Sequence, residues 1–393
     1  MNQSPFDRVG ALQFNRDGVM SVTLIDGRSF TARLGRPAFT ETSSIFMTTY
    51  LPNSSVMQFL TTRGDLILID LPSPSDLAPT QGRPTVYLDQ NHWSTLSDAI
   101  HDPSRVKNTD ELAAATAIID RAQRREILLP LSWAHLSETC KQVDPHERYQ
   151  RGVTMAQLSA GWQFADPLAL RRFELVRAMK QRYQDVTLPP PTAVTLAPEA
   201  SLTQRVWSPQ DDDSDLPEPV RWATHVLSCI CATFDVLLDA EHIPAEPTAG
   251  WASQFQKFAA FLATDPTGPE VKRVRTGAKF LADSSIEVAH AAHESGLSPS
   301  QLSEWFVQHA HSDVDQMPAL RLYREVMHEK LCNPNLRWRD NDLTDMMYLT
   351  AGAAYCDHLV GEKGHVSHMR RGLARLDESD NLHTKLRDLA KVL

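Results

Sequence analysis

The chain has 393 residues, of which 42% are hydrophobic and 22% are charged, and its formal net charge is −10. This composition is typical of a folded globular protein and excludes a disordered chain, while the length allows roughly two or three domains. The negative charge provides no overall basic field that would attract nucleic acid, so binding of that kind requires local basic patches.

The cysteines and the first residues of the chain favour a cytoplasmic protein. No apolar leader segment follows MNQSPFDRVG, and no apolar run approaches the length of a membrane span. The five cysteines are scattered and odd in number, which does not suggest a disulfide framework. Cys229 and Cys231 follow His225 closely, but no further ligands with zinc-finger spacing come after them. We interpret these two cysteines as core thiols of a buried helix.

Residues 1–75 predict a small antiparallel β domain. Asp26-Gly27 is its strongest hairpin signal. Short and partly alternating segments, separated by turn residues, predict strands at residues 11–14, 20–25, 29–34, 56–61 and 65–71. We expect about five strands in a small barrel or sandwich. Residues 76–83, part of a stretch rich in Pro and Ser, predict a linker.

Residues 84–98 (PTVYLDQNHWSTLSD) carry the first candidate site residue. The apolar run Val86 to Leu88 predicts a buried strand that ends in Asp89. Ligands of open α/β sheets bind outside the carboxyl ends of the strands, so Asp89 is well placed for chemistry. Asn91 is either the N-cap of the next helix or a group that holds a water, a phosphate or a metal-bound carboxylate.

A second acid follows a similar pattern. Residues 109–125 predict an amphipathic helix, and the apolar run 127–131 after it predicts another strand. Ser132 is a candidate helix N-cap, and Glu138 lies one to two turns into that helix. Glu138 is therefore the second candidate site residue.

Further acids lie in residues 340–363. Asp342 and Asp345 are three residues apart, so a helix places them on one face. Asp357 then precedes a short predicted strand, residues 358–361, and Glu362 follows it. His365 and His368 come one turn apart on the next predicted helix, where they either contact a scissile phosphate or form a surface face, and we expect the latter.

Between Glu138 and Asp342, the sequence predicts a long helical region at residues of about 145 to 332. The predicted helices are 145–160, 167–184, 220–241, 250–263, 270–293, 299–310 and 316–331. Arg370 and Arg371 lie just beyond this region and the last predicted strand. They either contact phosphates of a nucleic acid or form a solvated helix face.

Several carboxylates at one sheet edge cannot all ionise without a compensating charge. A hard divalent cation, Mg²⁺ or Mn²⁺, supplies that charge and prefers oxygen ligands. Such an ion activates a bound water and stabilises the leaving oxygen of a phosphodiester. The predicted catalytic and metal-binding residues are Asp89, Glu138, Asp345 and Asp357, with Asp342 and Glu362 as further ligands through a water or a second metal.

The order of these features resembles PIN-domain, or PIN-like, metal-dependent nucleases over roughly residues 84–145 and 335–375. Asp89 and Glu138 match the first and second acids of that family, and Asp345 matches the third better than Asp342 does. Gly361-Glu362 stands where Thr–x–Asp is common, so the fourth acid is either Asp357 or Glu362.

The resemblance implies an α/β fold in which helices flank a parallel sheet over residues 84–393, with the helical region at about 145–332 as an insertion. It also implies hydrolysis of RNA phosphodiesters, with single-stranded or flapped DNA as the alternative substrate. A bacterial toxin or defence nuclease would suit this architecture, as would a homo-oligomer or a protein partner that inhibits or activates the enzyme. We expect no membrane partner.

Two other classes of function compete with the nuclease. One is a catalytically inactive scaffold that binds nucleic acid or protein and retains a decayed site. The other is a metal-dependent phosphatase of small substrates. The sequence contains no G-x-x-x-x-G-K-[ST], G-x-G-x-x-G, G-x-S-x-G or H-E-x-x-H motif, so NTPases, dinucleotide enzymes, α/β-hydrolases and zinc proteases lack their usual signatures.

Overall fold

The structure is a computed structural model with a mixed α/β fold, and the chain forms two compact units. It describes residues 8–33, 39, 43–54, 56–72, 76–197, 199–202, 218–238 and 250–393. The first unit comprises residues 1–83, 93–164 and 194–244, and the second comprises residues 84–92, 165–193 and 245–393. These boundaries differ from the predicted division, because segments that lie far apart in the sequence pack together in each unit.

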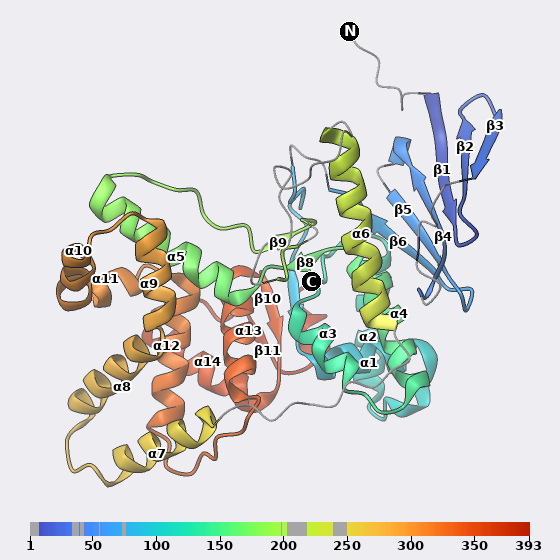
Figure 1. Cartoon of the computed structure of the whole chain (residues 1–393). Helices are drawn as coiled ribbons and strands as arrows, with labels where there is room; N and C mark the ends of the chain where they lie inside the picture. Colours follow the sequence, from blue (N-terminus) through green and yellow to red (C-terminus); the bar gives the residue numbers. More distant parts are fainter. Residues whose placement is uncertain are drawn as a thin grey trace. The chain divides into compact units, whose positions relative to one another are not determined.

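A six-stranded antiparallel sheet, drawn in blue in Figure 1, dominates the first unit, with strand order β3-β2-β1-β4-β5-β6. Its strands are β1 (Val9–Asn15), β2 (Val19–Leu24), β3 (Ser29–Arg33), β4 (Ile45–Leu51), β5 (Val56–Thr61) and β6 (Leu66–Asp70). The five predicted strands are confirmed within two residues at each end. Gly27 adopts a φ of 85° in the predicted β2–β3 turn, a conformation that glycine adopts without strain.

The central strand β4 is absent from the prediction. It pairs with β1 on one side and with β5 on the other. Strand β4 contains two adjacent polar residues, Thr48 and Thr49, and both are buried. Apolar and polar residues therefore do not alternate along β4 as they do along a typical half-buried strand.

Four helices of the first unit are α2 (Thr109–Gln123), α3 (Trp133–Cys140), α4 (Pro145–Ser159) and α6 (Glu218–Leu238). Helix α4 packs against β6 and α6. A Cβ atom at Gly152 would lie 2.3 Å from the carbonyl oxygen of Leu237, so glycine permits this close contact. Helix α6 is also tied to the region of the sheet, because Asp235 accepts hydrogen bonds from Ser43 Oγ (2.8 Å) and Ser44 N (3.1 Å). Strands β8 (Gln163–Phe164) and β9 (Val194–Thr195) form a small antiparallel pair.

The second unit contains a three-stranded parallel sheet with strand order β11-β10-β7. Its strands are β7 (Val86–Leu88), β10 (His358–Val360) and β11 (Leu382–His383). Helix α13 (Asp342–Tyr355) precedes β10, and helix α14 (Lys363–Arg375) follows it. A Cβ atom at Gly352 would lie 2.9 Å from Cγ of the buried Tyr87, so α13 approaches the sheet closely at that glycine.

Helix α12 (Pro318–Leu331) is the central helix of the second unit and contacts α5, α7, α8, α13 and α14. The buried Glu174 of α5 caps its first turn, because its carboxylate accepts hydrogen bonds from Ala319 N (2.7 Å), Leu320 N (3.0 Å) and the Tyr355 hydroxyl (2.5 Å). The remaining helices are α5 (Pro167–Gln184), α7 (Trp251–Thr264), α8 (Pro269–Asp283), α9 (Ser285–Glu294), α10 (Pro299–Glu304), η4 (Trp305–His309), α11 (Ala310–Val314) and α15 (Leu386–Leu389).

The helical region predicted as one insertion is divided between the two units, with α4 and α6 in the first and α5 and α7–α12 in the second. Its helices are confirmed with two exceptions. The segment predicted at 270–293 forms two helices that meet at Ser284, and the segment predicted at 299–310 is divided into α10, the π-helix η4 and the start of α11. The last residues predicted for the helix at 220–241 lie outside the described part of the chain. Among the described helices, none has the length and apolar character that crossing a membrane requires.

Candidate acidic metal site

The carboxyl edge of the parallel sheet in the second unit brings together two of the predicted acids. Strands β7 and β10 pair in parallel, with Leu88 opposite Val360, and Asp89 N donates a hydrogen bond to the Val360 carbonyl (2.9 Å). Asp89 and Glu362 therefore both leave the sheet at the edge where its strands end. This is the edge at which open α/β sheets bind ligands.

The negative charge of Glu362 acts on the carboxyl group of Asp89. Burial raises the pKa of Asp89, and the negative charge of Glu362 raises it further, while the backbone N–H groups of Gln90 and Glu362 lower it. The side-chain amide of Asn91, on helix α1 (Gln90–His101), donates a hydrogen bond to Glu362 Oε1. Asn91 thus contacts a carboxylate, while its predicted role at a water, a phosphate or a metal-bound carboxylate stays a prediction.

Asp357, predicted as a catalytic and metal-binding residue, does not join this group. It precedes β10 and accepts hydrogen bonds on Oδ2 from Thr85 N (2.7 Å) and Thr85 Oγ1 (2.8 Å) at the amino end of the strand pair. A strand rises about 3.3 Å per residue, so the four residues from Thr85 to Asp89 separate the two edges by about 13 Å. Glu362 is therefore the better candidate for the fourth acid.

The first turn of α13 supplies two more acids. Asp342, Asp345 and His365 of α14 can each direct one ligand atom so that all three atoms lie within 4.8 Å of one another. His365 Nε2 lies 3.5 Å from Asp345 Oδ2. Burial lowers the pKa of His365, as does the nearby Lys330, so the neutral imidazole that binds a metal is favoured near neutral pH.

Lys330 of α12 supplies a positive charge inside this group. Its side chain is only 2% exposed, and Nζ lies 3.0 Å from Asp342 Oδ1. The other carboxylate oxygen of Asp342 accepts a hydrogen bond from Arg339 N (2.8 Å). Burial lowers the pKa of Lys330, whereas the ion pair with Asp342 raises it. Lys330 therefore already balances part of the negative charge of Asp342. The other two candidate ligand atoms, Asp345 Oδ2 and His365 Nε2, lie 3.5 Å apart.

Glu138, the predicted second acid, lies on α3 in the first unit. Burial lowers the pKa of Arg151 there, and the charge of Glu138 is one of the smaller effects that oppose this. Ser132 is the N-cap of α3, as predicted. The predicted strand at 127–131 is not formed, and Leu131 makes only an isolated parallel bridge to Gln163. Participation of Glu138 in a site with Asp89 stays a prediction.

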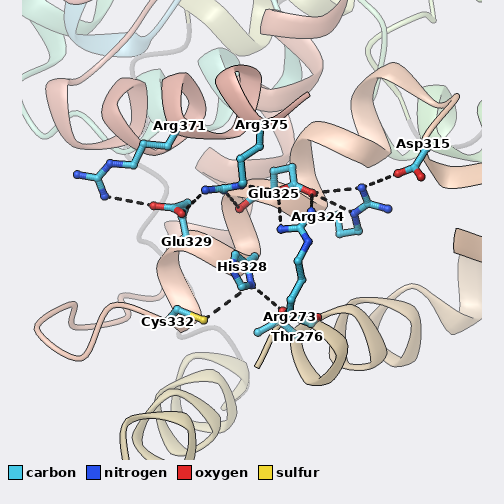
Figure 2. Close-up of polar contacts among 10 residues, drawn as sticks. All are labelled: Arg273, Thr276, Asp315, Arg324, Glu325, His328, Glu329, Cys332, Arg371 and Arg375. Carbon is cyan, nitrogen blue, oxygen red and sulfur yellow. Dashed lines mark hydrogen bonds and ion pairs between the residues drawn. The ribbon is translucent and has the colours of Figure 1, made fainter. Parts of the chain in front are cut away.

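The arginines predicted to contact phosphate already pair with carboxylates of the chain. Arg370 Nε donates to Asp380 Oδ2 (2.7 Å), and Arg371 Nη1 donates to Glu329 Oε2 (3.2 Å). Figure 2 shows Arg371 at one end of a charged network that extends through Glu329 and Arg375 to Glu325. Both arginines are about half exposed, so they belong to ion pairs on the surface.

For two residues of this site, the prediction from the sequence was wrong or missing. His365 was expected on a surface face, yet its side chain is only 16% exposed. Lys330 was not singled out, because a lysine in a predicted helix is almost never buried unless it is paired, and the sequence did not show its pairing with Asp342. The partners of both residues come from another helix, α13, which supplies Asp345 to His365 and Asp342 to Lys330.

A cavity of about 500 Å³ also lies in the second unit, between α8, α11 and α12. Its wall includes Val274, Phe280 and Val314, together with Arg273 and Arg324. None of the candidate acids lines it, so it is separate from the acidic site.

No protein-family model, curated protein or solved structure matches the chain. The assignment of function therefore rests on the residues and their geometry.

Proposed function

We propose that this protein is a metal-dependent nuclease of the PIN-like kind that cleaves RNA in preference to single-stranded DNA. The observation that carries the proposal is the convergence at the carboxyl edge of a parallel strand pair. Asp89 and Glu362 leave the sheet there. Burial lowers the pKa of His365, the charge of Glu362 partly opposes this, and His365 Nε2 lies 3.5 Å from Asp345 Oδ2. In this proposal β7, β10 and β11 belong to the parallel sheet of a PIN-like domain in a cytoplasmic protein.

The donor set fits a divalent cation. Asp345 and His365 are the primary ligands, and Asp342 adds a carboxylate oxygen, although Lys330 already contacts its Oδ1 and Arg339 N its Oδ2. Carboxylates suit Mg²⁺ and Mn²⁺, and the imidazole of His365 favours Mn²⁺ as the softer of the two. When bound, the ion supplies an activated water and stabilises the leaving oxygen of the phosphodiester.

The residues of the chain have separate roles around that ion. Asp89 and Glu362 hold waters of the ion or a second cation, and Asn91 keeps the Glu362 carboxylate in place through its hydrogen bond. The buried Lys330 limits the repulsion between the carboxylates before a metal arrives.

The test is a cleavage assay on labelled single-stranded RNA and DNA with Mg²⁺, Mn²⁺ or EDTA. We expect cleavage that requires a metal and falls at least about 100-fold in Asp345→Asn and Asp89→Asn, because each change removes a carboxylate oxygen that binds the ion or its waters.

Asp357→Asn is the matched control, since Asp357 lies at the opposite edge of the same strands. If circular dichroism shows that Asp357→Asn is folded, its cleavage rate should stay within a few-fold of the wild-type rate. Cleavage that persists in Asp89→Asn and Asp345→Asn would contradict the proposal, as would intact strands under every condition. Phosphate release from small phosphoesters without strand cleavage would indicate the phosphatase instead.

One observation favours the inactive scaffold as the second candidate. Lys330 already provides a cation at Asp342, as a decayed metal site would after losing its ion. A scaffold of this kind would bind RNA without cleaving it and would show no Mn²⁺ binding by electron paramagnetic resonance. The nuclease requires Mn²⁺ binding that disappears in Asp345→Asn.

A further inference from the structure

A second group of metal-ligating side chains lies in the first unit, apart from the acidic site. Glu199, His225 and Cys229 can each direct one ligand atom so that all three atoms lie within 4.8 Å of one another. His225 and Cys229 are four residues apart on α6 and therefore share one face of the helix. Glu199 comes from the turn that follows β9.

The distances within this group match those of a tetrahedral zinc site. His225 Nε2 lies 3.4 Å from Glu199 Oε1, and Cys229 Sγ lies 3.7 Å from His225 Nε2. With zinc bonds of about 2.0 Å to N and O and about 2.3 Å to S, the edges of a tetrahedron measure roughly 3.3 Å between N and O and roughly 3.5 Å between N and S. These are two of the three edges. Cys229 Sγ also lies 3.8 Å from His225 Nδ1, so the imidazole would have to rotate before Nε2 and Sγ could bind one ion.

Glu199 provides an independent indication that a cation belongs here. Its side chain is 12% exposed, and among the described residues no donor makes a hydrogen bond of suitable geometry to the buried Oε1 atom. A buried carboxylate oxygen without a hydrogen bond is costly. The imidazole of His225, 3.4 Å away, offsets that cost only when it is protonated, whereas a metal ion would remove it.

We propose that Glu199, His225 and Cys229 form a zinc site in which the ion ties the turn after β9 to α6. A donor set of one thiolate, one imidazole and one carboxylate suits Zn²⁺ and not Mg²⁺. Three protein ligands leave the fourth tetrahedral position for a water. This proposal is independent of the nuclease, since its ligands all lie in the first unit.

The local structure supports this role of the ion. Leu202 N donates a hydrogen bond to the Glu199 carbonyl (3.0 Å), which closes the turn, and Ser201 N donates to Gln163 Oε1 of β8 (3.3 Å). The turn is therefore held on the β8 side by a hydrogen bond, and the metal would hold it on the α6 side.

The test uses the full chain, stripped with a chelator and reloaded with Zn²⁺ or Co²⁺. Asp345→Asn serves as the background, so that the acidic site of the second unit contributes no metal binding. We expect one equivalent of zinc, a higher melting temperature with zinc, and a cobalt–thiolate charge-transfer band in the near ultraviolet. Cys229→Ser should abolish the band, and Glu199→Gln should weaken zinc binding by at least about 10-fold.

Cys231→Ser is the matched control, because Cys231 lies on the same helix but outside the group. It should leave the cobalt band and the zinc stoichiometry unchanged. A band that persists in Cys229→Ser would overturn the proposal. Folded protein that takes up no zinc would also overturn it, as would an equal loss of the cobalt band in Cys231→Ser and Cys229→Ser.

Discussion

At the scale of single residues, Glu325 is the most strongly paired carboxylate among the described residues. Its side chain is fully buried and accepts hydrogen bonds from Arg273, Arg324 and Arg375 (Figure 2). Burial by itself raises the pKa of Glu325, but the arginines outweigh this effect and lower the pKa to about 2. The carboxylate therefore connects α12 with α8 and α14.

We expect Glu325→Gln to destabilise the protein by about 1–3 kcal/mol, because the buried carboxylate loses its charge-assisted hydrogen bonds, while Arg324 and Arg375 keep Asp315 and Glu329 as partners. Urea denaturation followed by circular dichroism measures the change. Asp380→Asn is the control, since Asp380 forms an exposed pair with Arg370 and should cost at most about 1 kcal/mol. A cost for Glu325→Gln no larger than that of the control would show that the network contributes little.

The same residue predicts a dependence of stability on pH. A carboxyl whose pKa is lower in the folded state than in the unfolded state stabilises the fold above its unfolded value, here 4.5. That stabilisation is lost as the pH falls from there through about 2. The free energy of unfolding of the wild type should therefore fall more steeply between pH 5 and pH 3, roughly, than that of Glu325→Gln. Parallel curves for the two proteins over this range would contradict the assignment.

At the scale of elements, the candidate nuclease site depends on how closely α13 approaches the sheet. Gly352 faces the ring of Tyr87 and the side chain of Leu359, and a Cβ atom there would lie 2.9–3.1 Å from their atoms. Both neighbours are buried, so they have little room to move. A larger residue would push apart the helix that carries Asp345 and the strand that carries Asp89.

We expect Gly352→Ala to destabilise the protein by about 1–3 kcal/mol through overpacking. Gly277→Ala is the control on α8, because nothing lies within 4 Å of its added Cβ atom. It should be neutral or stabilise the helix by up to about 1 kcal/mol, owing to the higher helix propensity of alanine. Thermal unfolding of the two variants separates these effects. Equal stability of Gly352→Ala and the wild type would contradict the close packing.

The elements themselves were largely predictable from the sequence. Apolar residues at helical spacing predicted α5 at its observed bounds, and a short apolar run predicted β7. The prediction failed where burial follows no simple period, as at β4, whose adjacent threonines are both buried. It also failed at residues 127–131, because an apolar run shows that a segment is buried but not whether it finds a strand partner.

At the scale of the whole molecule, the two proposals place metals of different character in different units. The zinc ligands lie in the first unit, and Asp345 and His365 lie in the second. Each ligand set is complete within its own unit, so we expect the two metals to bind independently.

Cys229→Ser should remove the cobalt–thiolate band and leave Mn²⁺ binding unchanged, whereas Asp345→Asn should do the opposite. In the double variant the two losses should simply add, to within about 0.5 kcal/mol. Loss of Mn²⁺ binding in Cys229→Ser would show that the two sites are coupled.

The sequence by itself determined the secondary structure of most segments and identified Asp89 and the α13 aspartates as residues at element ends. These features depend on local periodicity, capping and turn residues, which act over a few residues. Only the tertiary structure decided which side chains meet. It placed Asp357 at the wrong edge of the strands, brought the buried Lys330 to Asp342 and added Glu199 to His225 and Cys229. Those contacts join segments that are separated along the chain. Strand pairing sets where each strand ends, and helix packing brings further side chains next to those ends.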